Sequence, residues 1–182
     1  MTKEQLSIAP GLLIAMPQLL DPNFRRSVVL MLEHNDDGSF GVVLNNPIHE
    51  TVTIHNEAGE AFSVTDHLYL GGPVSPQVGL VVHGDGWRGE RTHEIMPGLC
   101  VSEPSQAIPR LLELDSVPYR FVVGYSGWGP KQLENELAYG SWLTSSTSAD
   151  FIFDRPAVNQ WEEAIRALGI DPIMLVPSSD IQ

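Results

Sequence analysis

The sequence predicts an α+β fold, in which a mainly antiparallel sheet carries helices on one side. Two observations support this class: apolar runs of strand length dominate the first half of the chain, and helical patterns interleave with strands in the second half. The chain has 182 residues, of which 42 % are hydrophobic and 18 % are charged, values typical of a globular domain with a core of its own. We therefore predict a single domain over residues 1–182.

The first half of the chain predicts paired strands. Residues 28–32 form a continuous apolar run, which is typical of a strand buried on both faces. A turn cluster at 35–38 and a second apolar run at 41–45 follow. We predict a β-hairpin that ends at Pro47, because proline has no N–H to donate to a ladder. Further strands are expected as a short piece near 52–54 within the polar loop 49–66, from residue 68 to the break at 71–73, at 78–84 and at 98–102.

Helices are predicted in the second half. The segment 102–114 places its apolar residues on one helical face, and its helix is expected to begin at Ser105, because Pro109 is tolerated only near the first turn. The last helix is expected to begin at Pro156 and to end before Gly169. Between and after these helices we expect a strand at 119–125, a tight turn at 124–129, a helix at 130–138, strand pieces at 141–144 and 151–153, and a closing strand or extended segment at 173–177.

The charge of the chain argues against nucleic acid as a direct partner. The sequence holds 10 basic and 23 acidic residues, a net charge of −13, which repels polyanions on average. Its basic residues form only short runs at 25–26 and 88–91, whereas nucleic-acid-binding domains usually carry a basic patch or stripe. Direct DNA binding is therefore disfavoured.

Hydropathy and cysteine content favour a cytoplasmic protein. The apolar core near the start, residues 12–16, is shorter than a signal peptide requires, and no stretch approaches the ~20 apolar residues of a transmembrane helix. Cys100 is the single cysteine, so no disulfide can form within the chain, which fits a reducing compartment. Because Cys100 lies in an apolar predicted strand, we expect an inert core thiol.

The stretch GYSGWG at 124–129 lies between a predicted strand and a predicted helix, where hydrolases place a nucleophilic serine. A nucleophile elbow has the pattern Gly-x-Ser-x-Gly, but the second glycine position after Ser126 holds Trp128, and the glycine comes one place early. All six histidines precede Ser126, whereas the histidine follows the serine in that fold. The elbow pattern is therefore not met.

A phosphate-binding loop is matched no better by the same stretch. The glycine spacing is present, but Pro130 stands where the loop needs lysine, and Lys131 comes one place late. Glu134 places negative charge near the start of the following helix, where it opposes a bound anion. We interpret the stretch as a tight turn between strand and helix, with Trp128 as an anchor and the hydroxyl of Ser126 as a bystander.

No metal site and no cofactor are predicted. The pairs His49-Glu50 and His93-Glu94 are isolated, and the sequence contains neither His-Glu-x-x-His nor Cys-x-x-Cys. A lone histidine in a strand, such as His83, is more often hydrogen-bonded structure than a metal ligand.

Three stiff corners remain as candidate binding elements. Each interrupts or ends a strand with glycine or proline, and function concentrates on loops that rigid elements hold in place. Turn geometry alone explains each corner, and the sharper hypothesis is that the three share a rim that binds a partner or a ligand. The rim would consist of Asn45, Asn46, Pro47, Gly71, Gly72, Pro73, Ser126, Gly127, Trp128 and Gly129.

Five blocks of the sequence resemble the AlgH/YqgE family of bacterial proteins. They occur in the family's order, at 11–34, 41–47 (GVVLNNP), 68–74 (LYLGGPV), 79–84 (GLVVHG) and 124–143. The resemblance implies a compact α+β domain in which a bent, partly closed β-structure is flanked by helices. It implies no established enzyme activity and no catalytic residues. Members are often labelled transcriptional regulators, but this chain has no helix-turn-helix signature and no basic recognition helix.

These observations together predict a non-enzymatic protein that acts through an unknown protein partner, in the regulation of transcription. Two alternatives stay open. One is an enzyme of unknown reaction with a pocket near Ser126, which would use this serine or a histidine such as His83. The other is a regulator that binds DNA directly, which the net charge of −13 disfavours. The sequence indicates no oligomeric state.

Overall fold

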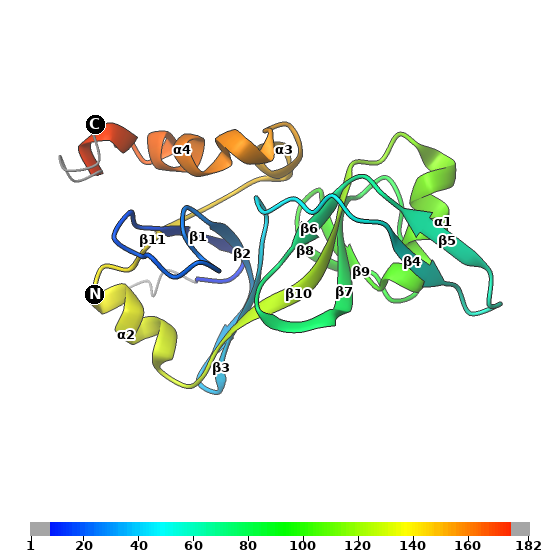
Figure 1. Cartoon of the computed structure of the whole chain (residues 1–182), viewed down its shortest axis with the longest axis horizontal. Helices are drawn as coiled ribbons and strands as arrows, with labels where there is room; N and C mark the ends of the chain where they lie inside the picture. Colours follow the sequence, from blue (N-terminus) through cyan, green and yellow to red (C-terminus); the bar gives the residue numbers. More distant parts are fainter. Residues whose placement is uncertain (1–7, 176–182) are drawn as a thin grey trace.

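The computed structural model of the protein describes residues 8–175. Within these residues, nine strands form one sheet in the order β11-β1-β2-β3-β10-β7-β9-β8, with β6 paired to β10, while β4 and β5 form a separate hairpin (Figure 1). No helix in this range is long and apolar enough to span a membrane. The strands are β1 (Gly11–Ala15), β2 (Val28–Asn35), β3 (Gly38–Val43), β4 (Val52–His55), β5 (Ala61–Val64), β6 (Leu68–Leu70), β7 (Val74–Gly84), β8 (His93–Met96), β9 (Leu99–Ser102), β10 (Tyr119–Trp128) and β11 (Trp142–Ser145). The helices are α1 (Pro104–Leu114), α2 (Gln132–Ala138), α3 (Ala149–Phe153), α4 (Ala157–Ala167) and a 3-10 helix (Pro172–Leu175).

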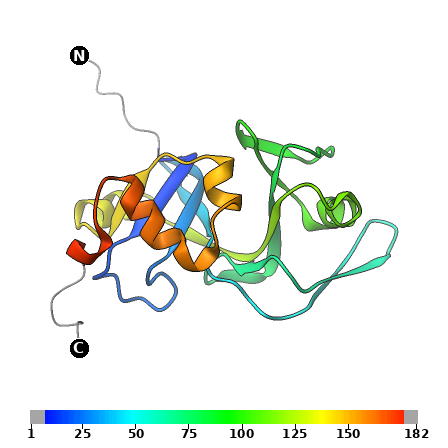
Figure 2. The ribbon, with the colours of Figure 1, turned by 90° about the horizontal axis from the view of Figure 1, so that it is seen from above.

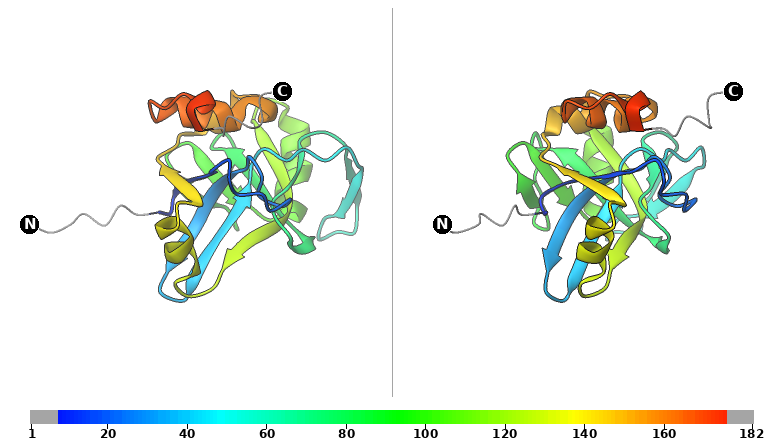
Figure 3. Two further views of the ribbon diagram at one scale, coloured as in Figure 1. Left: turned by 60° about the vertical axis from the view of Figure 1, so that its left-hand side comes forward. Right: turned by 90° about the vertical axis from the view of Figure 1, so that its left-hand side faces the viewer.

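Strand β10 joins the two halves of the sheet. Its last residues, 126–128, pair antiparallel with β3, whereas its earlier residues pair antiparallel with β7 and parallel with β6. The register against β7 shifts at Gly124, whose φ of +71° is a left-handed conformation that glycine adopts without strain. One strand thereby serves both halves, and the sheet curls (Figure 3). The predicted α+β class, with a curved, mainly antiparallel β-structure flanked by helices, is confirmed.

Helices cover both faces of the half built from β1, β2 and β3, and the prediction that they lie on one side was wrong. Successive strand residues point to opposite faces. In β1, Leu12 and Ile14 pack with Trp161 of α4, whereas Leu13 packs with Leu133 of α2. Because apolar residues follow one another along β1 and β2, each face needs a cover. Figure 1 shows α4 and α2 on opposite sides of these strands.

Helix α1 covers the other half of the sheet, next to the β4–β5 hairpin (Figure 2). Its buried face packs against Val81 and Phe121. The helix begins at Pro104, one residue before the predicted start, and keeps Pro109 in its interior. Burial of the apolar face outweighs the backbone hydrogen bond that this proline removes, since tertiary packing supplies most of the stability of short helices.

Three further local predictions were wrong. Residues 124–129 are not a tight turn, because β10 continues to Trp128 in register with β3. The expected strand at 151–153 belongs to α3, whose first turn is capped where the Ser148 hydroxyl accepts a hydrogen bond from the backbone N–H of Phe151. Residues 173–175 lie in the 3-10 helix, and the remaining two residues of the expected closing strand lie outside the described range.

Candidate functional site

Two of the three predicted corners lie side by side. Strand β6 runs antiparallel to the chain around Asn46 and Pro47, because the N–H of Leu70 donates to the carbonyl of Asn46 and Pro47 bridges to Tyr69. The next residue, Gly71, accepts two hydrogen bonds at its carbonyl: one from the N–H of Val43 and one, at 2.9 Å, from the Ser126 hydroxyl. The structure therefore brings the first two corners and Ser126 together.

The far end of the third corner lies elsewhere. Trp128 is buried, as an anchor must be, and its indole N–H donates to the Glu136 carboxylate at 2.9 Å. The indole of Trp142 donates to the same carboxylate oxygen at 2.8 Å. Gly129 is exposed and its N–H donates to the side-chain oxygen of Gln132 at the start of α2. The Trp128–Gly129 end thus docks α2 on the sheet.

The side chains of Asn45 and Ser126 are hydrogen-bonded to the backbone, whereas Asn46 is exposed. The Asn45 side chain accepts from the N–H of Val28 at 2.9 Å and donates to the carbonyl of Arg26 at 2.9 Å. Ser126 is fully buried, and its hydroxyl is held by the Gly71 carbonyl. Within residues 8–175 this hydroxyl makes no hydrogen bond to a side-chain base, and its burial leaves no access for a substrate. This residue therefore serves as a structural tie between β10 and the corner at 71–73.

His83 is also part of the framework. The carbonyl of Gly84 can only accept, so Nδ1 carries the proton and donates to it at 2.8 Å. Nε2 then accepts from the Ser102 hydroxyl at 2.9 Å, and the Thr92 hydroxyl, 2.7 Å from Ser102, completes the chain. Burial lowers the pKa of His83, outweighing the Gly84 hydrogen bond, and the Arg88 charge lowers it further. The imidazole is neutral and structural.

Stability is expected to fall with acidification because of His83. Its folded-state pKa lies below the ordinary 6.5, so the unfolded chain binds this proton first as the pH drops below about 6.5. We expect wild type to lose more free energy of unfolding than His83→Gln between about pH 7.5 and about pH 5.5, by at most about 1.4 kcal/mol per pH unit. Urea unfolding at both values measures this, and the other histidines cancel in the comparison. Equal pH slopes for the two proteins would contradict the assignment.

A hollow with apolar walls lies under the β4–β5 hairpin; we name it the hairpin groove. It has a volume of about 720 Å³ and runs between β4, the 76–79 segment of β7 and the start of α1. Phe121 and Val123 of β10 also line it, and Val52 and Ile54 of β4 line its other wall. Ile48 and Leu70, which adjoin the joined corners, line it as well.

An unpaired strand edge borders the hairpin groove. Within residues 8–175, β4 pairs with β5 alone, so its other edge has no ladder partner. Residues 75–78 of β7 also lack a partner strand in the same range, but they form a bulge in which Ser75 has a φ of +45° and Pro76 has no N–H. The free edge of β4 is of the kind that accepts an added strand.

Sequence reasoning found β4 only as a short piece and missed the groove. The signal was present: Val52 and Ile54 alternate with polar residues, and Phe62 and Val64 repeat the pattern in β5. Two such four-residue runs predict a hairpin. The high polarity of the surrounding segment hid them.

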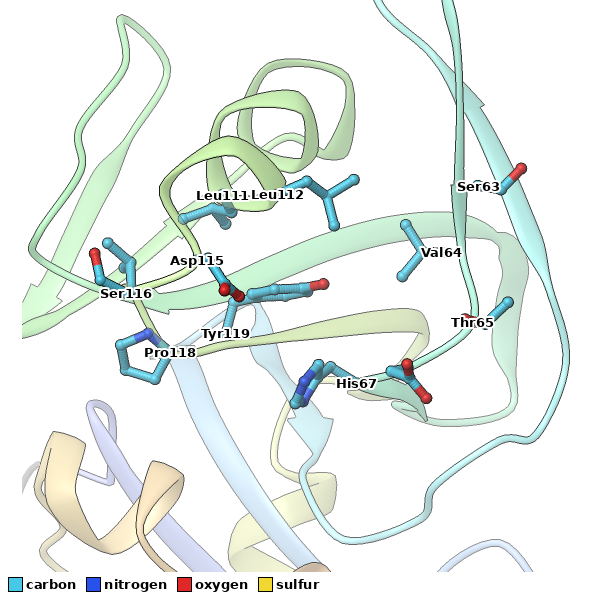
Figure 4. Close-up of a pocket in the computed structure, with 12 residues that line it drawn as sticks. Ser63, Val64, Thr65, His67, Leu111, Leu112, Asp115, Ser116, Pro118 and Tyr119 are labelled. Atoms are coloured by element: carbon cyan, nitrogen blue, oxygen red, sulfur yellow. The ribbon is translucent and has the colours of Figure 1, made fainter.

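A second hollow of about 490 Å³ lies at the other end of α1 (Figure 4). Figure 4 shows the Tyr119 ring between Asp115 and His67, beside Leu111 and Leu112 of α1. Burial raises the pKa of the Tyr119 phenol, and nearby carboxylates add to this effect. Among residues 8–175, no hydrogen bond joins the acids of this pocket to His67 or Tyr119, and no three metal-ligating side chains cluster. The pocket thus presents no paired acid and base.

Comparison with known proteins shows the family. A family model described as AlgH-like matches residues 12–173. A UPF0301 protein of Myxococcus xanthus is 45 % identical over 174 residues, covering 93 % of this chain and 96 % of the relative. A UPF0301 protein of Vibrio parahaemolyticus is 35 % identical over 182 residues, with the same coverage of both chains. The chain therefore belongs to the AlgH-like family, as its sequence blocks predicted.

Solved structures agree with this assignment. The solution structure of the AlgH protein from Pseudomonas aeruginosa matches with a TM-score of 0.71 and 29 % sequence identity, covering 96 % of both chains. A crystal structure of a protein from Corynebacterium diphtheriae matches with a TM-score of 0.71, at 22 % identity and with 93 % of this chain covered. The second match shows the shared fold alone.

Proposed function

We propose that this protein is a binding protein that takes up an extended segment of a protein partner in the hairpin groove. The observation that carries the proposal is the coincidence of an apolar hollow with the unpaired edge of β4. Main-chain hydrogen bonds to a free edge supply affinity in such complexes, and pockets for alternate side chains supply specificity. No acid–base pair is needed for this function.

The chemistry of the walls defines the segment. Apolar side chains at alternate positions would pack on Val52, Ile54 and Phe121. Glu50 and Glu103 line the groove, and no lysine or arginine does within the described range. Glu103 is paired with Arg91 at 2.8 Å, whereas Glu50 makes no ion pair within residues 8–175. We therefore expect an apolar segment with a basic residue beside Glu50, on a partner that the net charge of −13 attracts.

An effect on transcription would run through this partner. The proposal needs no contact with DNA, which the net charge of −13 disfavours. It also replaces the ten-residue rim by a neighbouring surface, since Ile48 follows Pro47 and Leu70 precedes Gly71 in the groove lining. On this proposal the joined corners support the groove and do not themselves bind.

The test is selection of short random peptides on the purified protein, followed by mapping of the bound peptide by NMR. We expect selected peptides to alternate apolar residues and to carry lysine or arginine. Amide shifts should concentrate on Val52–His55 and on 77–79, and Hα–Hα contacts between peptide and β4 should show strand pairing. Peptides that perturb only another surface, or that bind as helices, would refute the proposal.

Matched variants sharpen the test. Glu50→Lys is expected to weaken peptide binding about tenfold, because it reverses the charge that meets the basic residue. Glu57→Lys makes the same change at the exposed tip of the hairpin, outside the groove lining, and should stay within about twofold. Ile54→Ser removes an apolar contact and should also weaken binding. Equal effects of the two lysine variants would mean that the attraction is not local to the groove.

A further inference from the structure

A smaller cavity of about 340 Å³ lies where β10 meets the connection between α3 and α4; we name it the arginine cavity. Arg120 and Arg155 both line it, although the whole chain has only 10 lysines and arginines. His67 lines it too, and Asp154 is the carboxylate among its lining residues. His67 and Tyr119, labelled in Figure 4, border both this cavity and the pocket beside α1.

Arg120 is a buried cation without a counter-ion. Its side chain donates to the carbonyls of Leu44, Ile152 and Arg155 and to the side-chain oxygen of Gln160. All four acceptors are neutral, and within the described residues Arg120 forms no ion pair. The residue is only 4 % exposed. Buried charges in proteins are normally paired, because removing an ion from water is costly.

One donor of Arg120 is still free. The four hydrogen bonds use the two terminal nitrogens, and Nε–H has no partner among residues 8–175. The single sealed side-chain polar atom without a partner in this range is the hydroxyl oxygen of Ser27. The Nε–H of Arg120 is therefore not sealed from solvent, and Arg120 lines the cavity.

Arg155 supplies a second set of donors. Its Nε contacts the Glu163 carboxylate at 3.0 Å, and its terminal nitrogens make no hydrogen bond or ion pair with any residue between 8 and 175. A guanidinium with free terminal nitrogens binds carboxylate or phosphate oxygens through two parallel hydrogen bonds. Desolvation lowers the pKa of Arg120, and Tyr69, whose ring centroid lies 4.8 Å from the guanidinium carbon, acts in the opposite direction. An anion in the cavity would meet two cations and supply the missing counter-charge.

We propose that the arginine cavity binds a small anion, a phosphate or carboxylate group, through the Arg120 Nε–H and the terminal nitrogens of Arg155. The volume suits an inorganic ion or the charged end of a small metabolite. The site is separate from the hairpin groove: it shares none of the groove's lining residues. Peptide binding and anion binding can therefore fail or succeed independently.

The test titrates the full-length protein with inorganic phosphate and, separately, with succinate, at constant ionic strength in a chloride buffer. We expect saturable binding of at least one probe below about 10 mM, with shifts of the Arg120 and Arg155 Nε–H signals in NMR spectra. Saturation by phosphate alone assigns a phosphate ligand, and saturation by succinate alone assigns a carboxylate. Saturation by both shows that the site recognises the shared charge. Failure of both probes to saturate would overturn the proposal.

Two arginine variants distinguish a specific anion-binding site from non-specific electrostatic attraction of the anion. Arg155→Gln is expected to weaken binding about tenfold, because it removes the two-pronged contact. Arg166→Gln removes the same charge from an arginine that also pairs with a glutamate of α4, Glu162 at 3.1 Å, but lies outside the cavity lining. It should stay within about twofold. Equal weakening by both variants would overturn the site, and neither variant touches the buried hydrogen bonds of Arg120.

Discussion

Replacement of Arg120 by methionine is expected to lower the free energy of unfolding by about 3 kcal/mol. Methionine fills a similar volume but leaves the Leu44 carbonyl and the Gln160 side-chain oxygen without their donor, while the Ile152 carbonyl keeps a hydrogen bond from the Gln160 amide. An orphaned buried acceptor costs about 1–3 kcal/mol. Removal of an uncompensated buried charge acts in the opposite direction, as in ion pairs replaced by apolar residues. The cost of the orphaned acceptors exceeds the gain from removing one buried charge, so we expect a net loss of stability.

Urea unfolding in a phosphate-free buffer measures this effect. Arg110→Met is the matched control, because Arg110 lies on the exposed side of α1 and only pairs with Glu113 at 3.0 Å. The control should change stability by less than about 0.5 kcal/mol. Arg120→Lys should also destabilise the protein, since one ammonium cannot reach both the Leu44 carbonyl and the acceptors on α3 and α4. A stable Arg120→Met protein would show that Arg120 does not hold α3 and α4 to the sheet.

The substitution Gly72→Ala is expected to destabilise the protein by about 3 kcal/mol. A Cβ atom there would lie 2.3 Å from the carbonyl oxygen of Tyr125 and 2.5 Å from the Ser126 hydroxyl oxygen. The backbone also has a φ of +151°, which residues with a side chain rarely adopt. Relief would require β10 and β6 to separate, and with them the Gly71–Ser126 hydrogen bond.

The control for this substitution is Gly59→Ala in the β4–β5 turn. Gly59 has a φ of +81°, but a Cβ atom there would meet nothing within 4 Å. The control therefore carries the conformational penalty alone, about 1 kcal/mol. The difference between the two midpoints of urea unfolding isolates the close approach of the corner to β10. Equal losses of stability in the two variants would mean that Gly72 lies farther from β10 than the structure shows.

The candidate site was only partly readable from sequence. Glycine and proline at 71–73 indicated a corner, because those residues are needed where a backbone turns sharply or approaches another closely. The proposed role of the corner as a binding surface depended on which side chains point outward, and the sequence says nothing about that. Ser126 shows why: its neighbours in sequence suggest an exposed turn, while its hydrogen bond reaches Gly71, 55 residues earlier.

The hairpin groove and the arginine cavity differ in how far the sequence indicates them. The hairpin beside the groove left an alternating pattern in β4 and β5 that local reasoning can find. The arginine cavity left none, because the acceptors of Arg120 come from Leu44, Ile152, Arg155 and Gln160, up to 76 residues away. The sequence around an arginine does not indicate whether the tertiary structure will bury it.

What the sequence by itself determined were the local elements and the chemistry of the whole. Apolar periodicity within each segment predicted the β2–β3 hairpin and α4, and the acidic composition set the electrostatic character. Only the tertiary structure decided that β10 pairs with three strands, that Ser126 is buried and that Arg120 and Arg155 meet at one cavity. These features arise from contacts between residues far apart in sequence, and no local pattern encodes which distant strand edge or carbonyl a residue will meet.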